Sequence, residues 1–153
     1  MKTTRRDMLA HSTAVFALMA SAGLLPASAR AAWTQAAFDA KSMADVIKAL
    51  GGGTPTESKD VTLTGPDIAE NGAVVPVGAS TSLAGVKRLA ILVEKNPSVL
   101  AAVFDVTDGI DANLSTRVKM GQSSNVYAVA MMADGKVLYG VKEIKVTLGG
   151  CGG

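Results

Sequence analysis

The chain has 153 residues, of which 48% are hydrophobic and 18% charged, and this length and composition are typical of one globular domain. Its formal charge of +2 comes from the N-terminal segment, because residues 32–153 alone carry 11 basic and 12 acidic side chains. A nearly neutral body with only 4% aromatic residues argues against a nucleic-acid-binding surface, which needs basic patches and stacking side chains.

The first 31 residues predict an export signal. The pair Arg5-Arg6 precedes an apolar run over 14–25, and small residues follow up to Ala31. A membrane-spanning helix needs about 20 apolar residues, whereas this run is shorter and ends at Pro26. The paired arginines resemble the twin-arginine signal, so we expect a bacterial periplasmic protein that is cleaved after Ala31 or Ala29.

A helix is expected directly after this signal. Between Phe38 and Leu50 the apolar residues recur near helical spacing, and three consecutive glycines from Gly51 end the pattern. The helix is amphipathic, so one of its sides should lie on another part of the fold.

The rest of the chain predicts a mainly β domain. Short runs rich in β-branched residues are separated by turn residues, and no pattern of helical length lies between them, which favours a β-sandwich over a parallel α/β sheet. The expected strands are Val61–Thr64, Val74–Val77, Val86–Val93, Val99–Val106, Leu114–Met120, Asn125–Met132 and Lys136–Leu148. The dipeptide Asp134-Gly135 predicts a two-residue hairpin between the last two. Residues 32–148 would thus form the helix and the sandwich.

Two of these runs, Val99–Val106 and Asn125–Met132, are almost continuously apolar. They are either central strands covered on both faces, by the helix and by the second sheet, or strands whose surplus apolar face binds a protein partner. The sequence leaves both interpretations open.

The residues that the body lacks restrict its chemistry. The only histidine is His11, inside the export signal, and the only cysteine is Cys151. Ser–His and Cys–His catalysis, an internal disulfide and a thiolate metal cluster are therefore excluded within the exported chain. Asp105, Asp108 and Asp111 loosely match a calcium-binding loop, but their spacing is wrong, and a solvated turn is favoured. We expect no resident metal or cofactor.

The candidate functional site is the C-terminal end. Cys151 lies between Gly149-Gly150 and Gly152-Gly153, directly after the last expected strand. Glycine combines backbone freedom with a small cross-section, so residues 149–153 predict a flexible arm that can enter a narrow channel of another protein. No second cysteine, histidine or helix N-terminus is nearby to activate the thiol. The pattern therefore indicates a covalent carrier that other proteins load and unload.

Two alternatives remain from the residues alone. A structural or adhesive β-sandwich could dimerise through a Cys151 disulfide, and it would carry no sulfur adduct. A thiol-dependent enzyme acting by itself is disfavoured, because the exported chain has neither a histidine nor a second cysteine.

The mature chain resembles the SoxY family, the sulfur-carrier subunits of the bacterial thiosulfate-oxidising system. The resemblance rests on the twin-arginine leader and on four segments: Ile68–Val77, Glu94–Pro97, Ser115–Met120 and Gly149–Gly153. Val99 departs from the family, whose members often carry a second proline there. The resemblance implies an immunoglobulin-like antiparallel sandwich, in agreement with the expected strands.

The resemblance also implies a reaction cycle on Cys151 and a set of partners. A c-type cytochrome complex would join thiosulfate oxidatively to the thiol, and a hydrolase would release sulfate and leave a persulfide. In some hosts a sulfane dehydrogenase would oxidise the remaining sulfur. The carrier would act as a heterodimer with a SoxZ-type subunit and would not itself be an enzyme.

For two other polar segments a structural role is favoured over a functional one. Glu70-Asn71-Gly72 could shape a functional loop, but a turn in which Asn71 and Gly72 take positive φ is favoured. Arg117 and Lys119 could bind thiosulfate, although their alternation with Val118 and Met120 is typical of a strand with one solvated face.

Overall fold

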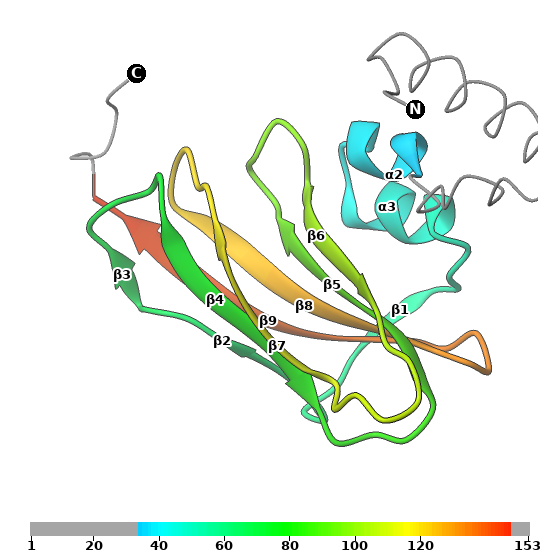
Figure 1. Ribbon diagram of the computed structural model, residues 1–153. Helices are drawn as coiled ribbons and strands as arrows, with labels where there is room; N and C mark the ends of the chain where they lie inside the picture. Colours follow the sequence, from blue (N-terminus) through cyan, green and yellow to red (C-terminus); the bar gives the residue numbers. More distant parts are fainter. Residues whose placement is uncertain (1–33, 148–153) are drawn as a thin grey trace, which may run out of the picture. The chain divides into compact units, whose positions relative to one another are not determined.

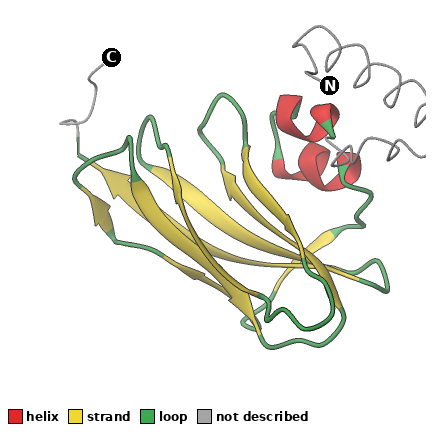
Figure 2. Cartoon of the chain, viewed as in Figure 1, coloured by secondary structure: helices red, strands yellow, loops and turns green. Residues whose placement is uncertain are grey.

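Two β-sheets pack face to face in the computed structural model, which describes residues 34–147 (Figures 1 and 2). The larger sheet contains β1 (Pro55–Glu57), β3 (Ile68–Ala69), β5 (Val86–Val93), β6 (Leu100–Asp105), β8 (Ser124–Met132) and β9 (Val137–Val146). The smaller sheet contains β2 (Val61–Thr64), β4 (Val75–Thr81) and β7 (Asn113–Val118). The prediction of a mainly β sandwich is confirmed.

The strand order of the larger sheet is β1-β9-β8-β5-β6, and that of the smaller sheet is β2-β4-β7. Most neighbouring strands are antiparallel. The exceptions are β1 and β3, two short strands that both pair with β9 in parallel. β9 is therefore paired along one side with β8 and along the other with two separate segments of the N-terminal half.

Two helices, α2 (Gln35–Asp39) and α3 (Met43–Ala49), stand where the sequence predicts one helix from Phe38 to Leu50. The helical pattern is interrupted at Ala40, whose backbone is extended. Ser42 then caps α3, because its Oγ accepts a hydrogen bond from the amide of Asp45 at 3.1 Å. The spacing of apolar residues does not reveal this break, because both helices direct apolar residues toward the same sheet.

The interior has two apolar clusters, one on each face of the larger sheet. One cluster lies between the sheets and includes Leu89, Ile91, Val126, Ala128 and Ile144. The other lies between the larger sheet and the helices and includes Val46, Ile47, Leu92, Val129 and Met131. Of the two nearly continuous apolar runs, Asn125–Met132 forms β8, which supplies both clusters and is buried on both faces as one interpretation predicted. The other run, Val99–Val106, contains β6, which is an edge strand and not a central one, and most of its residues after Leu100 are only partly buried.

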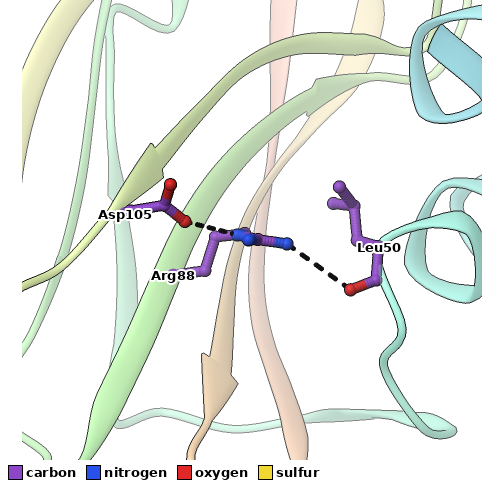
Figure 3. A network of polar contacts seen from close by, with 3 residues as sticks. All are labelled: Leu50, Arg88 and Asp105. Carbon is purple, nitrogen blue, oxygen red and sulfur yellow. Dashed lines mark hydrogen bonds and ion pairs between the residues drawn. The ribbon is translucent and has the colours of Figure 1, made fainter. Parts of the chain in front are cut away.

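One arginine joins the end of α3 to the larger sheet, as Figure 3 shows. Arg88 of β5 donates from Nε to Asp105 of β6 at 2.7 Å and from Nη1 to the carbonyl of Leu50 at 3.4 Å. Leu50 is the C-terminal cap of α3, where the backbone carbonyls favour a cation. Asp105 therefore forms an ion pair with Arg88 and is not a free ligand in an acidic loop.

The hairpin between β8 and β9 is longer than predicted. The amide of Met132 donates to the carbonyl of Lys136 at 2.9 Å, so three residues, Ala133–Gly135, form the loop. Gly135 has φ of 85° and donates its amide to the carbonyl of Met132 at 3.1 Å. This is the arrangement of a three-residue hairpin with a glycine in the left-handed region, and the dipeptide alone does not distinguish it from the two-residue type.

Candidate functional site

The predicted carrier residue Cys151 and its neighbours Gly149, Gly150, Gly152 and Gly153 lie outside the described residues. The last described residue is Thr147, four positions before the cysteine. A fully extended chain advances about 3.4 Å per residue, so the cysteine can reach at most about 14 Å from Thr147. The end of β9 therefore decides which part of the domain surface the thiol can approach.

The end of β9 is held by the segment around β3. The two strands pair in parallel, with Ile68 opposite Lys145 and Ala69 opposite Val146. The amide of Lys145 donates to the carbonyl of Asp67 at 3.0 Å, and the amide of Thr147 donates to the carbonyl of Ala69 at 3.1 Å. Backbone hydrogen bonds thus continue to the final described residue.

A third segment binds the same end of β9 from the opposite side. The amide of Val146 donates to Oγ of Ser123, in the β7–β8 loop, at 2.9 Å. Because β3 and this loop hold successive residues of β9, the base of the predicted arm has a defined position on the sandwich.

Gly72 brings the β3–β4 loop against the β7–β8 loop. The amide of Met120 donates to the carbonyl of Gly72 at 2.7 Å. A Cβ at Gly72 would collide with the carbonyl oxygen of Met120 and would lie 2.8 Å from Cγ1 of Val146. Close approach of two chains therefore explains this glycine.

Asn71 shapes the same loop through its side chain. Its Oδ1 accepts a hydrogen bond from the amide of Ala73 at 2.9 Å, which is the Asx-turn arrangement. The turn at Asn71-Gly72 is as predicted, but the positive φ is not: the described non-glycine residues have none, and the glycines with positive φ do not include Gly72.

The Glu94–Pro97 segment joins this end of the molecule as well. Asn96 donates from Nδ2 to the carbonyl of Lys119 at 2.7 Å, and its Oδ1 accepts from the amide of Gly121 at 3.4 Å. The amide of Lys95 donates to Oγ of the buried Ser124 at 3.0 Å. The β5–β6 loop is thereby tied to the β7–β8 loop.

Parts of the segments Ile68–Val77, Glu94–Pro97 and Ser115–Met120 thus meet at one end of the sandwich, where β9 ends (Figure 1). The loop after β3, the loop after β5 and the loop after β7 all contribute. Two exposed apolar side chains lie in the β3–β4 segment, Ile68 at 56% and Val74 at 50% exposure. Sequence spacing could not show this convergence, because the three segments are joined only by long-range hydrogen bonds.

An ion pair reinforces the approach of the β2–β3 connection to β9. Nζ of Lys142 lies 2.8 Å from Oδ1 of Asp67 and donates to the carbonyl of Gly65 at 2.6 Å. The hydrogen bond from Lys142, followed by its positive charge, lowers the pKa of Asp67 below its ordinary value of 3.8. This pair was not anticipated from the sequence, since 75 positions separate its members and neither residue belongs to a recognisable motif.

Arg117 and Lys119 are both exposed, as expected for a solvated face. Arg117 lies on the outer side of β7 and borders a shallow groove of about 450 Å³ with Thr64, Gly78 and Ser115. Within residues 34–147, neither cation forms an ion pair. The groove lies mainly on the smaller sheet and also includes Gly65, whose carbonyl accepts the hydrogen bond from Lys142 of β9.

Residues 34–147 hold no group of three or more side chains suited to binding a metal ion. In this same part of the chain, no helix has the length and apolar character needed to cross a membrane.

Comparison with known proteins places these features in a family. The family model described as "Sulfur oxidation protein SoxY" matches residues 47–151. No match is found among curated protein sequences.

Solved structures add two comparisons. The sulfur carrier protein SoxY from Chlorobium limicola f thiosulfatophilum is 34% identical, with a TM-score of 0.60, over 67% of this chain and 93% of that one. A superoxide reductase (neelaredoxin) from Ignicoccus hospitalis is 16% identical, with a TM-score of 0.51, over 57% of this chain and 79% of that one. The second likeness concerns the fold alone.

Proposed function

Because the chain belongs to the SoxY family of sulfur oxidation proteins, we propose that it is a periplasmic sulfur carrier that holds thiosulfate-derived sulfur on Cys151. The observation that carries this proposal is the extent of the family match, which includes Cys151 and the entire sandwich after α3 begins. The solved relative at 34% identity is itself named a sulfur carrier protein.

The base of the arm suits this role. β9 is fixed up to Thr147 by bonds to Ala69 and, through Val146, to Ser123. A thiol within about 14 Å of such a fixed point can be presented repeatedly to partner active sites while the sandwich stays folded. The exposed Ile68 and Val74 beside this base offer apolar surface for the proteins that receive the arm.

The proposed cycle needs no base or redox group from the carrier. The thiolate of Cys151 and thiosulfate form a sulfur–sulfur bond to give an S-thiosulfonate, and two electrons pass to a c-type cytochrome complex. Water then cleaves the terminal sulfur–sulfur bond, which releases sulfate and two protons and leaves a persulfide on Cys151. In hosts with a sulfane dehydrogenase, that enzyme accepts six electrons while three water molecules supply the oxygen atoms and release six protons, which converts the persulfide to an S-sulfonate. A second hydrolysis then releases sulfate and two protons and restores the thiolate.

This division of labour agrees with the composition of the exported chain. It has no histidine, and its single thiol has no second cysteine to resolve a mixed disulfide. Activation of the thiol and removal of sulfate therefore fall to the partner proteins, and the carrier is a substrate of these enzymes. Heterodimer formation with a SoxZ-type subunit and export of residues 32–153 by the twin-arginine pathway belong to the same proposal.

Intact-protein mass spectrometry tests the proposal. The protein is isolated from the periplasm of cells grown with and without thiosulfate, beside a Cys151→Ser variant. We expect reducible thiosulfonate or persulfide adducts only with thiosulfate and only on the chain that has Cys151. An unmodified thiol, or a Cys151-linked homodimer as the sole product under thiosulfate, would support a structural disulfide-bonded sandwich in place of the carrier.

A further inference from the structure

The helices cover only part of the outer face of the larger sheet. Beyond the buried Leu92 and Val129, this face presents Tyr127 of β8 and Tyr139 and Val141 of β9. The two tyrosine rings meet edge to face, with centroids 5.8 Å apart and an angle of 69°. Both rings are half-buried, and Val141 is 40% exposed. We call these three residues the tyrosine face.

Three glutamates surround the tyrosine face. Strand pairing sets Glu57 of β1 opposite Tyr139 and Glu143 of β9 opposite Asn125. On the other side of Asn125, Glu94 accepts hydrogen bonds from the Asn125 side-chain amide at 2.9 Å and from the Tyr127 hydroxyl at 3.4 Å. All three glutamates are exposed.

The rim glutamates form no ion pair in the described part of the chain. The ion pairs of residues 34–147 involve Asp67, Asp105 and Asp134, and none involves a rim glutamate. Lys145 follows Glu143 by two positions on the same side of β9, so one cation stands beside three carboxylates. The surface is therefore apolar and aromatic at its centre and negative at its edge.

We propose that the tyrosine face and its rim, Glu57, Glu94 and Glu143, dock a different protein, whose contacting surface carries lysine or arginine around apolar side chains. Tyrosine is one of the residues enriched among those that dominate binding at the centre of protein interfaces, and unpaired rim charges select a partner of opposite sign. A symmetric contact with a second copy would set acidic rim against acidic rim.

Part of the tyrosine face lies on the strand that leads toward Cys151. β9 runs from Val141 and Glu143 to Val146, and Thr147 follows it, two positions before the predicted arm at 149–153. A protein bound on the tyrosine face therefore lies along the strand that leads to the carrier thiol. The inference rests on the sheet geometry and does not require sulfur chemistry on Cys151.

Site-specific photo-crosslinking in the intact cell tests the proposal. A benzophenone amino acid is placed at Val141 of the full chain, and at the exposed Thr62 of the smaller sheet as the matched control. We expect Val141, but not Thr62, to capture a protein of different sequence through a peptide that contains lysine or arginine. The combined Glu57→Lys and Glu143→Lys changes should reduce the capture about ten-fold, and reversal of the partner's basic residues to glutamate should restore it.

Several results would overturn the proposal. These are capture of a second copy of this chain, equal or absent capture at both positions, and capture that the charge reversals leave unchanged. Because Glu57 and Glu143 are exposed and form no ion pair within residues 34–147, the reversed variants should keep the thermal stability of the parent, which a denaturation curve checks. The crosslink should persist in the Cys151→Ser variant, because docking does not involve the thiol. Failure of the docking proposal is therefore distinguishable from failure of the carrier proposal.

Discussion

Gly72 and Met120, which are separated by 48 positions in the sequence, meet at the end of the sandwich through a 2.7 Å hydrogen bond from the amide of Met120 to the carbonyl of Gly72. The missing side chain of Gly72 leaves room for the Met120 carbonyl and for Val146 of β9. Gly72, in the β3–β4 loop, thus allows this loop and the β7–β8 loop to approach each other closely beside the end of β9.

Replacement of Gly72 by alanine should destabilise this end of the molecule. The new Cβ meets backbone on one side and a packed valine on the other, and such overpacking costs about 1–3 kcal/mol. Chemical denaturation of the variant measures the loss. Gly121→Ala is the matched control, because a Cβ there has open space within 4 Å and the backbone is not in the left-handed region. Equal stability of the two variants would contradict the packing argument.

Removal of the Ser123 hydroxyl should weaken the hydrogen bonding of the last residues of β9. The Ser123→Ala variant leaves the amide of Val146 without its acceptor, which costs about 1 kcal/mol. Amide hydrogen exchange at Val146 and Thr147 should become faster in this variant. Ser115→Ala, on an exposed position of β7, serves as the control and should leave these two amides unchanged. Unchanged exchange in Ser123→Ala would show that β3 alone holds the strand end.

The ion pair of Lys142 with Asp67 predicts a specific acid titration. Asp67 has a pKa below 3.8 because Lys142 donates a hydrogen bond to it and adds a positive charge. The ionised carboxylate is the form that the folded protein favours, so the pair stabilises the fold above pH 3.8 and loses this effect as the pH falls through the lower folded-state pKa. NMR titration of the Asp67 carboxyl carbon should show the pKa return toward 3.8 in Lys142→Met. In the control Lys59→Met the pKa should stay low, and a low value in both variants would refute the assignment to Lys142.

Tyr127 should ionise above the ordinary value of 10.0. Burial is the larger cause of its raised pKa, and the negative charge of Glu94 is the second. The Glu94→Gln change should therefore lower the pKa of Tyr127 only in part, as observed by NMR of its ring carbons. Glu57→Gln, which removes a rim charge that does not contact Tyr127, should have little effect. A complete return to 10.0 in Glu94→Gln would mean that charge outweighs burial at this ring.

Local sequence patterns predicted the strands that are long enough to show a clear pattern of apolar residues. The runs Val61–Thr64 and Val86–Val93 coincide with β2 and β5, and the others differ from the observed strands mainly at their ends. β1 and β3 were missed, because strands of three and two residues carry almost no periodicity. Their parallel pairing with β9 depends on contacts across more than 75 positions, which no local pattern contains.

The sequence by itself determined that residues 32–153 have one thiol, which is bracketed by glycines, and no histidine, because these are matters of composition and order. It also left two interpretations of the apolar runs Val99–Val106 and Asn125–Met132, which are burial on both faces or a surplus apolar face that binds a protein. Only the tertiary structure decided between them, and only it brought Gly72, Asn96 and Ser123 together at the end of β9 and placed three glutamates around Tyr127 and Tyr139. These relationships arise from strand register and long-range hydrogen bonds, whose energies depend on the packed sheet and not on any neighbouring residues in the chain.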